Sequence, residues 1–425
     1  MKRLSLSQLL PLTALGFALG LLSATLEPAL LGYKVLELAP ERRNTALGFT
    51  TFVGLMVAIL TQPIIGALSD RTRSHCGRRL PYFVTGTALA NVCLIWLAST
   101  TTYAFFLASV VVLQLASNTI QGPWQALIPD HVPDQQRGLA SGMKVLIEGS
   151  AAVVGRLIAG QIMGHVGEWG SAAIVAAIAI PSIGLIAAVI ITARGIPDSL
   201  PNDPGAQPQS IRAVLFRTFS IDLRAYPAFG WWFLNRLLFW CAVISVSIFL
   251  LFFAIDVVGL SSDAAQRYIG QMTVVLGAAL LVCALPASRL ADRISRKRLV
   301  FFAGCVACLG TSIVLITRDL TVMTIGGAVI GAGVGIYLIA NWALITEIVP
   351  RAEAARYLGV ANVATAGGSA IARLLGGMLI DSLNAATGSS SIGYLTLYAI
   401  AAGLFLLSAL AMIPLHSISR PTDAK

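Results

Sequence analysis

Charged residues are scarce in this 425-residue sequence. Asp, Glu, Lys and Arg make up 11% of the chain, whereas hydrophobic residues make up 57%. A soluble domain carries about 25% charged residues, and a soluble monomer as apolar as this chain would expose large apolar patches. The scarcity of charge therefore excludes a soluble globular protein, and the high hydrophobicity excludes an intrinsically disordered chain.

Histidine is rare, and the cysteines lack a pattern. The chain has four His and six Cys, and the cysteines form neither a disulfide framework nor a paired metal-ligand motif. Cys305 and Cys308 have C-x-x-C spacing, but they lie in an apolar stretch, where we interpret them as packing residues. No nucleophile–base or metal-ligand constellation is visible in the sequence. We therefore expect no enzymatic activity, no metal and no cofactor.

The net charge of +10 does not indicate a nucleic-acid partner, because the basic residues stand in short runs between apolar stretches. With a cytoplasmic N-terminus, 20 Lys and Arg residues fall in cytoplasmic segments and 5 in external segments. An excess of positive charge marks the cytoplasmic side of a membrane protein. The asymmetry predicts a multi-pass protein of the plasma (inner) membrane, with both termini in the cytoplasm.

Long apolar stretches recur along the whole chain. Ten of them contain no charged residue or histidine: 5–26, 45–69, 81–99, 102–129, 171–193, 237–255, 268–288, 299–317, 320–346 and 391–415. Two further stretches, 138–165 and 357–380, are apolar but carry a few charges. A helix that crosses the bilayer needs about 20 apolar residues. The sequence thus predicts an all-α integral membrane protein with twelve transmembrane helices, the first of which is not a cleaved signal peptide.

The chain divides into two similar halves. A proline-rich segment separates six helices from six, which predicts an N-terminal half at 1–193, a cytoplasmic linker at 194–225 and a C-terminal half at 226–425. Arg156-Leu-Ile-Ala-Gly160 matches Arg373-Leu-Leu-Gly-Gly377, and Pro133 matches Pro350, both at a step of 217 residues. Two six-helix halves related by a parallel repeat, with a site between them, form the layout of a major facilitator carrier.

The loop after the second predicted helix carries the most specific motif. It reads Gly66-Ala-Leu-Ser-Asp70-Arg71-Thr-Arg73-Ser-His-Cys-Gly77-Arg78-Arg79, which resembles the loop signature of the major facilitator superfamily. With Gln62-Pro63-Ile-Ile-Gly66 and Asn118-Thr-Ile-Gln121-Gly122-Pro123-Trp124, it resembles the glycoside–pentoside–hexuronide:cation symporters, and most closely their sucrose-carrier-like branch.

This resemblance implies the major facilitator fold and a symporter that moves a sugar or glycoside by alternating access. Residues 55–62 contain no acid, so we do not expect the sodium site of melibiose-type carriers, and protons are the expected coupling ion. The expected partners are a small-molecule substrate and the lipid bilayer. We expect the chain to be a monomer.

Charged residues at the cytoplasmic ends of helices are candidates for a gate. A carboxylate at a helix end can accept hydrogen bonds from an arginine or a helix N-terminus across the cytoplasmic seam. Anchoring of the topology is the alternative role. The candidates are Asp70, Arg71, Arg78, Arg79, Asp130, Asp292, Arg293 and Glu347.

Charges inside the predicted helices need a partner or a function, because burying them in hydrocarbon is costly. At about 1.5 Å rise per residue, Glu27, Arg156 and Arg373 share a depth in the membrane. We expect Glu27 to face one of these arginines and to couple a proton to transport, with a static salt bridge as the alternative. Pro28 is expected to bend the first helix. Glu148 is the second candidate for proton coupling, and its i, i+4 spacing allows a pair with Lys144.

The remaining polar and basic residues within the helices are candidates for substrate binding. Sugars are bound by amides together with an aromatic face, and the resemblance implies a basic residue near Lys144. The alternative is hydrogen bonding between helices. The candidates are Gln62, Asn118, Gln121, Trp124, Lys144, Arg156, Asn235, Arg236, Tyr337, Asn341 and Arg373.

Three other functions remain open at this point. The charges inside the predicted helices leave a surplus of positive charge, which is compatible with an organic anion such as a uronate as the substrate. An exporter of amphipathic compounds would need a largely apolar cavity. A carrier fold used as an assembly factor, without transport, would need no cavity.

Overall fold

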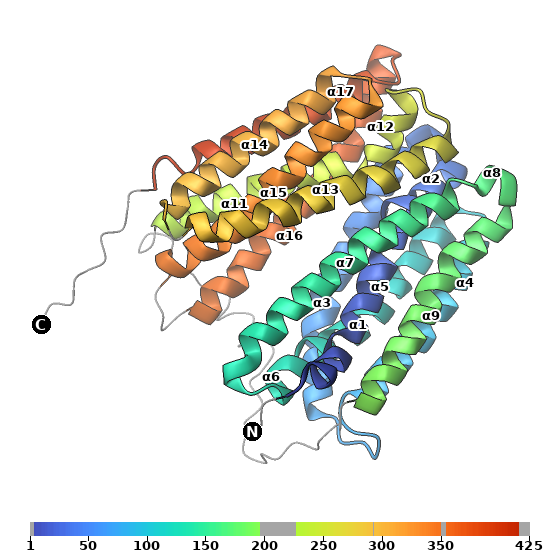
Figure 1. The fold of residues 1–425 in the computed structure, drawn as a ribbon. Coiled ribbons are helices and arrows are strands. Elements are labelled where there is room, and N and C mark those ends of the chain that lie inside the picture. The colour runs from blue at the N-terminus through green and yellow to red at the C-terminus, as the bar shows by residue number, and fades with distance from the viewer. Residues whose placement is uncertain (1–3, 196–226, 292, 350–353, 416–425) are drawn as a thin grey trace, which may run out of the picture. The chain divides into compact units, whose positions relative to one another are not determined.

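The computed structural model describes residues 4–195, 227–291, 293–349 and 354–415 (Figure 1). All regular secondary structure in these ranges is helical, and twelve helices are long and apolar enough to cross a membrane. The predicted all-α membrane fold with twelve spans is therefore confirmed. Nearly all of the predicted linker 194–225 lies outside the described residues.

The helices cluster into two compact units. The N-terminal unit comprises Met1–Pro208 and Leu260–Gln271, and the C-terminal unit comprises Gln209–Gly259 and Met272–Lys425. The N-terminal unit therefore includes the first turns of a helix whose remainder belongs to the C-terminal unit. The domain boundaries expected from the sequence stay a prediction.

Four pairs of long helices make the main packing contacts of the N-terminal unit. α1 contacts α7 and α9, while α5 contacts α3 and α4, and Figure 1 shows α1 beside α7. Their bounds are α1 Leu6–Thr25, a π-helical segment Leu26–Leu30, α2 Leu31–Leu38, a 3-10 turn Pro40–Arg42, α3 Arg43–Arg71, α4 Leu80–Ser99, α5 Tyr103–Gln125, α6 Leu127–His131, a 3-10 turn Asp134–Gln136, α7 Arg137–Met163, α8 Val166–Trp169 and α9 Ser171–Gly195.

The first transmembrane helix begins with a capping box and ends in a break. Ser5 and Gln8 form the two reciprocal hydrogen bonds of this box, which pair backbone N–H groups in the first turn of α1. Glu27 has φ −102° and ψ 127°, which is extended backbone inside the π-helical segment. The residue before a proline is driven out of the α-helical region, so Pro28 accounts for this conformation. The predicted bend at Pro28 is confirmed.

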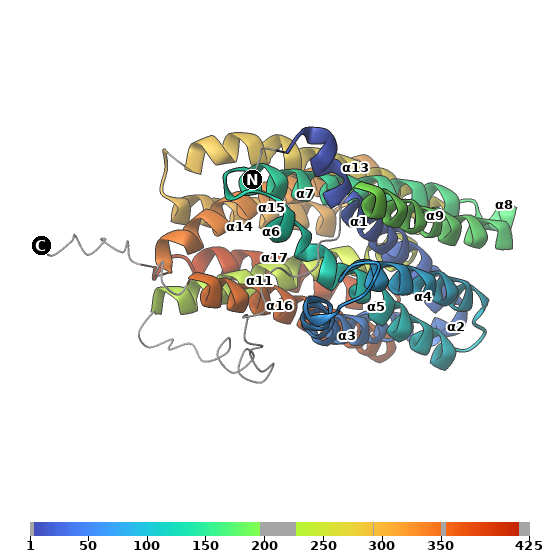
Figure 2. The same ribbon diagram turned by 90° about the horizontal axis from the view of Figure 1, so that it is seen from below.

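Two helices, α11 and α14, make the main packing contacts of the C-terminal unit. The first, α11, packs against α16 and α17, and α14 packs against α15 and α17 (Figure 2). Its helices are α11 Pro227–Ile248, α12 Leu250–Asp256, the part of α13 (Ser262–Ala291) from Met272 onward, α14 Arg296–Ile316, α15 Leu320–Ile348, α16 Ala354–Thr387 and α17 Ile392–Leu410.

Hydrogen bonds link the start of α13 to the end of α7 and to α8 within the N-terminal unit. The Asp263 carboxylate accepts from the Gly167 backbone N–H at 3.1 Å, and Arg267 donates to the Gly164 carbonyl. The backbones meet closely at Gly160 and Gly270, where a Cβ on Gly160 would lie 2.9 Å from the Gly270 Cα. Glycine is needed at this approach, because any side chain would separate the two helices.

Candidate functional site

An arginine cluster lies where α3, α4 and α5 reach the same end of the N-terminal unit. Arg79 is 1% exposed and donates to the Asp130 carboxylate, to the Pro123 carbonyl and, at 3.4 Å, to Asp70. Arg78 donates to the same Asp130 carboxylate. The structure thus brings together four of the residues predicted for the gate, and Arg71, at the end of α3, is exposed.

The C-terminal unit repeats this arrangement with one ion pair. Arg296 Nη1 lies 2.9 Å from Glu347 Oε1 and donates to the Ala343 carbonyl at 3.0 Å. The repeat step of 217 residues separates Arg79 from Arg296, and it also separates Asp130 from Glu347. The sequence analysis selected the exposed Arg293 and missed Arg296, although the repeat would have found it. The predicted gate residue Asp292 lies outside the described residues.

Trp124 is a buried residue of the N-terminal unit. Its side chain is 2% exposed, and its Nε1 donates to the Leu12 carbonyl of α1 at 2.8 Å. The ring lies against Gly16, where a Cβ would overlap it. The Lys144 ammonium lies 4.3 Å from the centroid of the same ring. Lys144 therefore turns toward Trp124, and it forms no ion pair with Glu148 within 4.0 Å in the described part of the chain, although the two share a face of α7.

Replacing Gly16 with alanine should destabilise the protein by about 1–3 kcal/mol, because the new methyl group must displace the Trp124 ring from a filled site. Thermal unfolding of purified protein in detergent measures the loss. Gly149→Ala on α7 is the matched control, since a Cβ at Gly149 meets no atom within 4 Å. That variant should be as stable as the wild type or slightly more stable. Equal unfolding temperatures for both variants would contradict the packing described for Gly16.

The predicted amide residues of α3 and α5 have different environments. Asn118 is 3% exposed, and its amide donates to the Gln114 carbonyl at 2.8 Å, one turn earlier in the same helix. Gln62 and Gln121 are half-buried. The hydrogen bonding of Asn118 fits the structural alternative raised for it, whereas Gln62 and Gln121 keep accessible surface.

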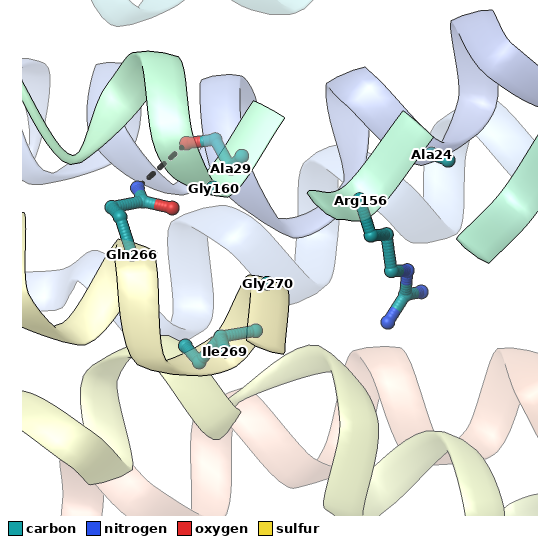
Figure 3. Close-up of a pocket in the computed structure, with 7 residues that line it drawn as sticks. All are labelled: Ala24, Ala29, Arg156, Gly160, Gln266, Ile269 and Gly270. Atoms are coloured by element: carbon teal, nitrogen blue, oxygen red, sulfur yellow. Dashed lines mark hydrogen bonds between the residues drawn. The ribbon is translucent and has the colours of Figure 1, made fainter. Parts of the chain in front are cut away.

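Arg156 lines a small cavity in the N-terminal unit (Figure 3). Gln266, at the start of α13, is 2% exposed and donates to the Ala29 carbonyl at 3.2 Å, next to the break in the first helix. The cavity measures about 10 Å³, close to the size that one water needs; it is lined by Ala24, Ala29, Arg156, Gly160, Gln266, Ile269 and Gly270. Sequence reasoning missed Gln266. The pairing of Glu27 with Arg156 or Arg373, which lies in α16, stays a prediction.

Four predicted substrate-binding residues meet in one buried network of the C-terminal unit: Asn235, Arg236, Tyr337 and Asn341. Each is at most 3% exposed. Asn235 Oδ1 accepts from the Tyr337 hydroxyl at 2.9 Å and from the Asn341 amide at 3.2 Å. The Asn235 amide donates to the Ser408 hydroxyl at 2.8 Å. We call these four residues the Asn235 network.

Arg236 is held inside this network by neutral groups. Its Nε donates to the Thr365 hydroxyl at 2.9 Å, and its Nη1 donates to Asn341 Oδ1 at 2.6 Å. The guanidinium carbon lies 5.4 Å from the centroid of Trp232 and 4.7 Å from that of Trp342. Among the described residues, no carboxylate lies within 4.0 Å of this cation. A cation buried in this way is costly and indicates a function.

The sequence matches a known family along most of its length. The profile of the family described as "MFS/sugar transport protein" matches residues 41–416. The chain belongs to this family. Members are membrane transporters and not enzymes, and the family agrees with the resemblance drawn from the loop motif.

Individual relatives are similar over shorter stretches. The chain is 36% identical over 94 residues to the minor myo-inositol transporter IolF of Bacillus subtilis (strain 168), which is 22% of each chain. It is 28% identical over 120 residues to the sucrose transport protein SUC3 of Arabidopsis thaliana, covering 22% of this chain and 20% of the relative. The matches thus span about a fifth of these relatives' length.

Solved structures share the fold. The D-xylose–proton symporter aligns with a TM-score of 0.70 at 18% identity, covering 96% of this chain and 97% of the symporter. The nucleoside transporter NupG aligns with a TM-score of 0.72 at 15% identity, covering 96% of this chain and 99% of NupG. The predicted major facilitator fold is therefore confirmed for this MFS/sugar transport protein.

Proposed function

We propose that this member of the MFS/sugar transport family is a secondary active transporter that moves a sugar or glycoside by alternating access. The Asn235 network is the observation that carries the proposal. It concentrates two amides, a phenol and a guanidinium from α11 and α15 inside an apolar unit, where unpaired polar groups are costly. Such groups offer the donors and acceptors that the hydroxyls of a sugar require.

Protons are the proposed coupling ion, with no cofactor. Glu148 is half-buried within α7, and Glu27 stands at the break of the first transmembrane helix. An acid inside a membrane helix can exist in a neutral and a charged form, and the two forms favour different partners. Protonation of either residue would thereby favour one conformation of the carrier over another. The proposed setting is the plasma membrane, with both termini cytoplasmic and the chain a monomer.

Proteoliposomes containing the purified protein test the proposal. Adding a neutral sugar from a panel of disaccharides, glycosides and polyols should raise the external pH as protons enter with the substrate. Glu27→Gln or Glu148→Gln should reduce proton-driven uptake at least about tenfold. Sugar counterflow should stay intact in both variants, because exchange does not require net proton movement. Sugar uptake without proton movement would contradict the proposed proton coupling. No response to any sugar in the panel would contradict the proposed function.

An organic anion such as a uronate is the second candidate substrate, and the environment of Arg236 favours it. The guanidinium has five N–H donors, and its described hydrogen bonds go only to neutral acceptors. A carboxylate would supply the missing negative charge. In the proteoliposome assay, a rise in external pH with uronates and none with neutral sugars would identify the anion as the substrate. A response to apolar cations or drugs alone would instead indicate an exporter.

A further inference from the structure

A hydrogen bond from a distant helix holds the break of the first transmembrane helix. Gln266, near the start of α13, is 2% exposed, and its amide donates to the Ala29 carbonyl at 3.2 Å (Figure 3). Ala29 comes two residues after Glu27, whose extended backbone forms the break. The bond therefore fixes the chain just after the residue at which the helix is interrupted.

The helical segments on the two sides of the break have anchors of their own. Before the break, the Thr192 hydroxyl of α9 donates to the Pro11 carbonyl of α1 at 3.1 Å. After the break, Lys34 of α2 is 3% exposed and donates to the Thr100 carbonyl at 3.0 Å. The Gln266 bond differs from both, because it acts at the break itself, where a change of backbone conformation would begin.

Close packing against α7 fixes the backbone of Gln266. A Cβ on Gly160 would lie 2.6 Å from the Gln266 carbonyl oxygen and 2.9 Å from the Gly270 Cα. Helices whose backbones approach this closely have little room to shift against each other. Arg156 of α7 lines the small cavity beside this contact (Figure 3). The start of α13 is thus joined both to α7, which also carries Glu148, and to the break.

The helix that carries Gln266 continues beyond the N-terminal unit. Its residues up to Gln271 belong to that unit, and its residues from Met272 onward belong to the C-terminal unit. An α-helix transmits a displacement along its axis, because each residue is hydrogen-bonded to the next turn. A movement at the start of α13 is therefore carried along the chain into the C-terminal unit.

We propose that Gln266 is a positioning residue for proton coupling, whose bond to Ala29 makes α13 follow the conformation of the break at Glu27. This inference rests on the proposed function, in which protonation of Glu27 favours one conformation of the carrier. A change of the Glu27 backbone on protonation displaces Ala29, and the bond passes this displacement to α13. Gln266 acts in this role on the backbone and not on the substrate.

The variant Gln266→Leu tests this role, because leucine keeps a similar volume but has no donor. In proteoliposomes, proton-driven uptake should fall at least about tenfold, which lies within the usual size of a coupling between two sites. Counterflow should keep the KM and the maximal rate of wild type, because exchange does not require net proton movement. The sugar is the one for which wild-type protein shows counterflow in the panel above.

The matched control is Thr192→Val. Thr192 is 3% exposed and, like Gln266, donates to a backbone carbonyl of the first transmembrane helix, but away from the break. Valine keeps the shape of threonine and removes the hydroxyl donor. Uptake and counterflow of this variant should both remain as in wild type. An equal loss of uptake in Thr192→Val and Gln266→Leu would show a general loosening of the helix and overturn the proposal.

Hydrogen–deuterium exchange observes the bond without any transport. The amides of Leu26–Leu30 should exchange at least about threefold faster in Gln266→Leu than in wild type, since the loss of a neutral hydrogen bond shifts a local opening by about this factor. Thr192→Val should leave the exchange of these amides unchanged. Gln266→Asn keeps the amide but is one carbon shorter, so it should behave like Gln266→Leu, and it replaces that variant if leucine prevents folding.

Three results would overturn the role of Gln266. Exchange at Leu26–Leu30 that stays as in wild type would show that the bond does not hold the break. Proton-driven uptake that stays as in wild type would show that the bond carries no coupling. Loss of counterflow together with uptake would make Gln266 a structural residue. If wild-type protein moves no proton with any sugar, the proposed coupling fails first, and this failure is visible before any variant is made.

Discussion

Replacing Arg79 with methionine is expected to destabilise the protein by about 1–3 kcal/mol, because it leaves the buried Pro123 carbonyl without its donor and takes one of two arginines from the Asp130 carboxylate. Arg79 is 1% exposed, and its guanidinium bonds to Asp130, to Asp70 and to the Pro123 carbonyl. Methionine fills a similar volume but offers no donor. Thermal unfolding in detergent, followed by size-exclusion chromatography, measures the effect.

Two controls identify the cause of that loss. Arg78→Met should cost less, since its side chain is 17% exposed and Asp130 keeps its bond to Arg79. The double variant Arg79→Met with Asp130→Asn should cost less than the sum of the two single losses, because both substitutions remove the same ion pair. If the two single losses simply add in the double variant, the ion pair is not what Arg79 contributes.

Replacing Arg236 with methionine is expected to reduce transport at least about 100-fold and to change the unfolding free energy by only about 1 kcal/mol. The guanidinium bonds to the neutral groups of Thr365 and Asn341. Its removal leaves two acceptors without a donor, at about 1–3 kcal/mol each, and relieves a desolvation penalty of several kcal/mol. These opposing contributions nearly cancel, so the main loss is in binding.

The contrast between the two arginines is the decisive measurement. Counterflow in proteoliposomes and thermal unfolding are measured on Arg79→Met and Arg236→Met side by side. Arg79→Met should lose stability first, whereas Arg236→Met should fold normally and fail to transport. A large loss of stability for Arg236→Met would show that the guanidinium is a structural element of the Asn235 network, and it would remove this residue from the substrate site.

The twelve spans, the break of the first helix and the family all follow from local sequence. The spans follow because a helix must satisfy its own backbone hydrogen bonds in lipid, so hydropathy alone predicts them. Pro28 acts on the residue directly before it, so the extended backbone of Glu27 is also a local effect. The repeat step that relates Pro133 to Pro350 also relates Arg79 to Arg296.

The environments of Trp124 and Trp342 show what the sequence by itself could not determine. Both rings begin a similar motif at the end of a similar helix, so local pattern treats them alike. Trp124 is buried because Gly16, on another helix and far away in the chain, leaves room for its ring, whereas Trp342 is 38% exposed. Lys144 likewise turns to that ring, although the i, i+4 spacing favoured Glu148.

The sequence therefore determined which helices form, where the first one breaks and which polar residues lie inside the membrane. Only the tertiary structure decided which of those residues meet. Asn235 and Arg236 come together with Tyr337 and Asn341 through contacts across about a hundred residues of chain. Helix periodicity places a side chain on a face of its own helix, but the partner of that face is set by the packing of helices remote in sequence.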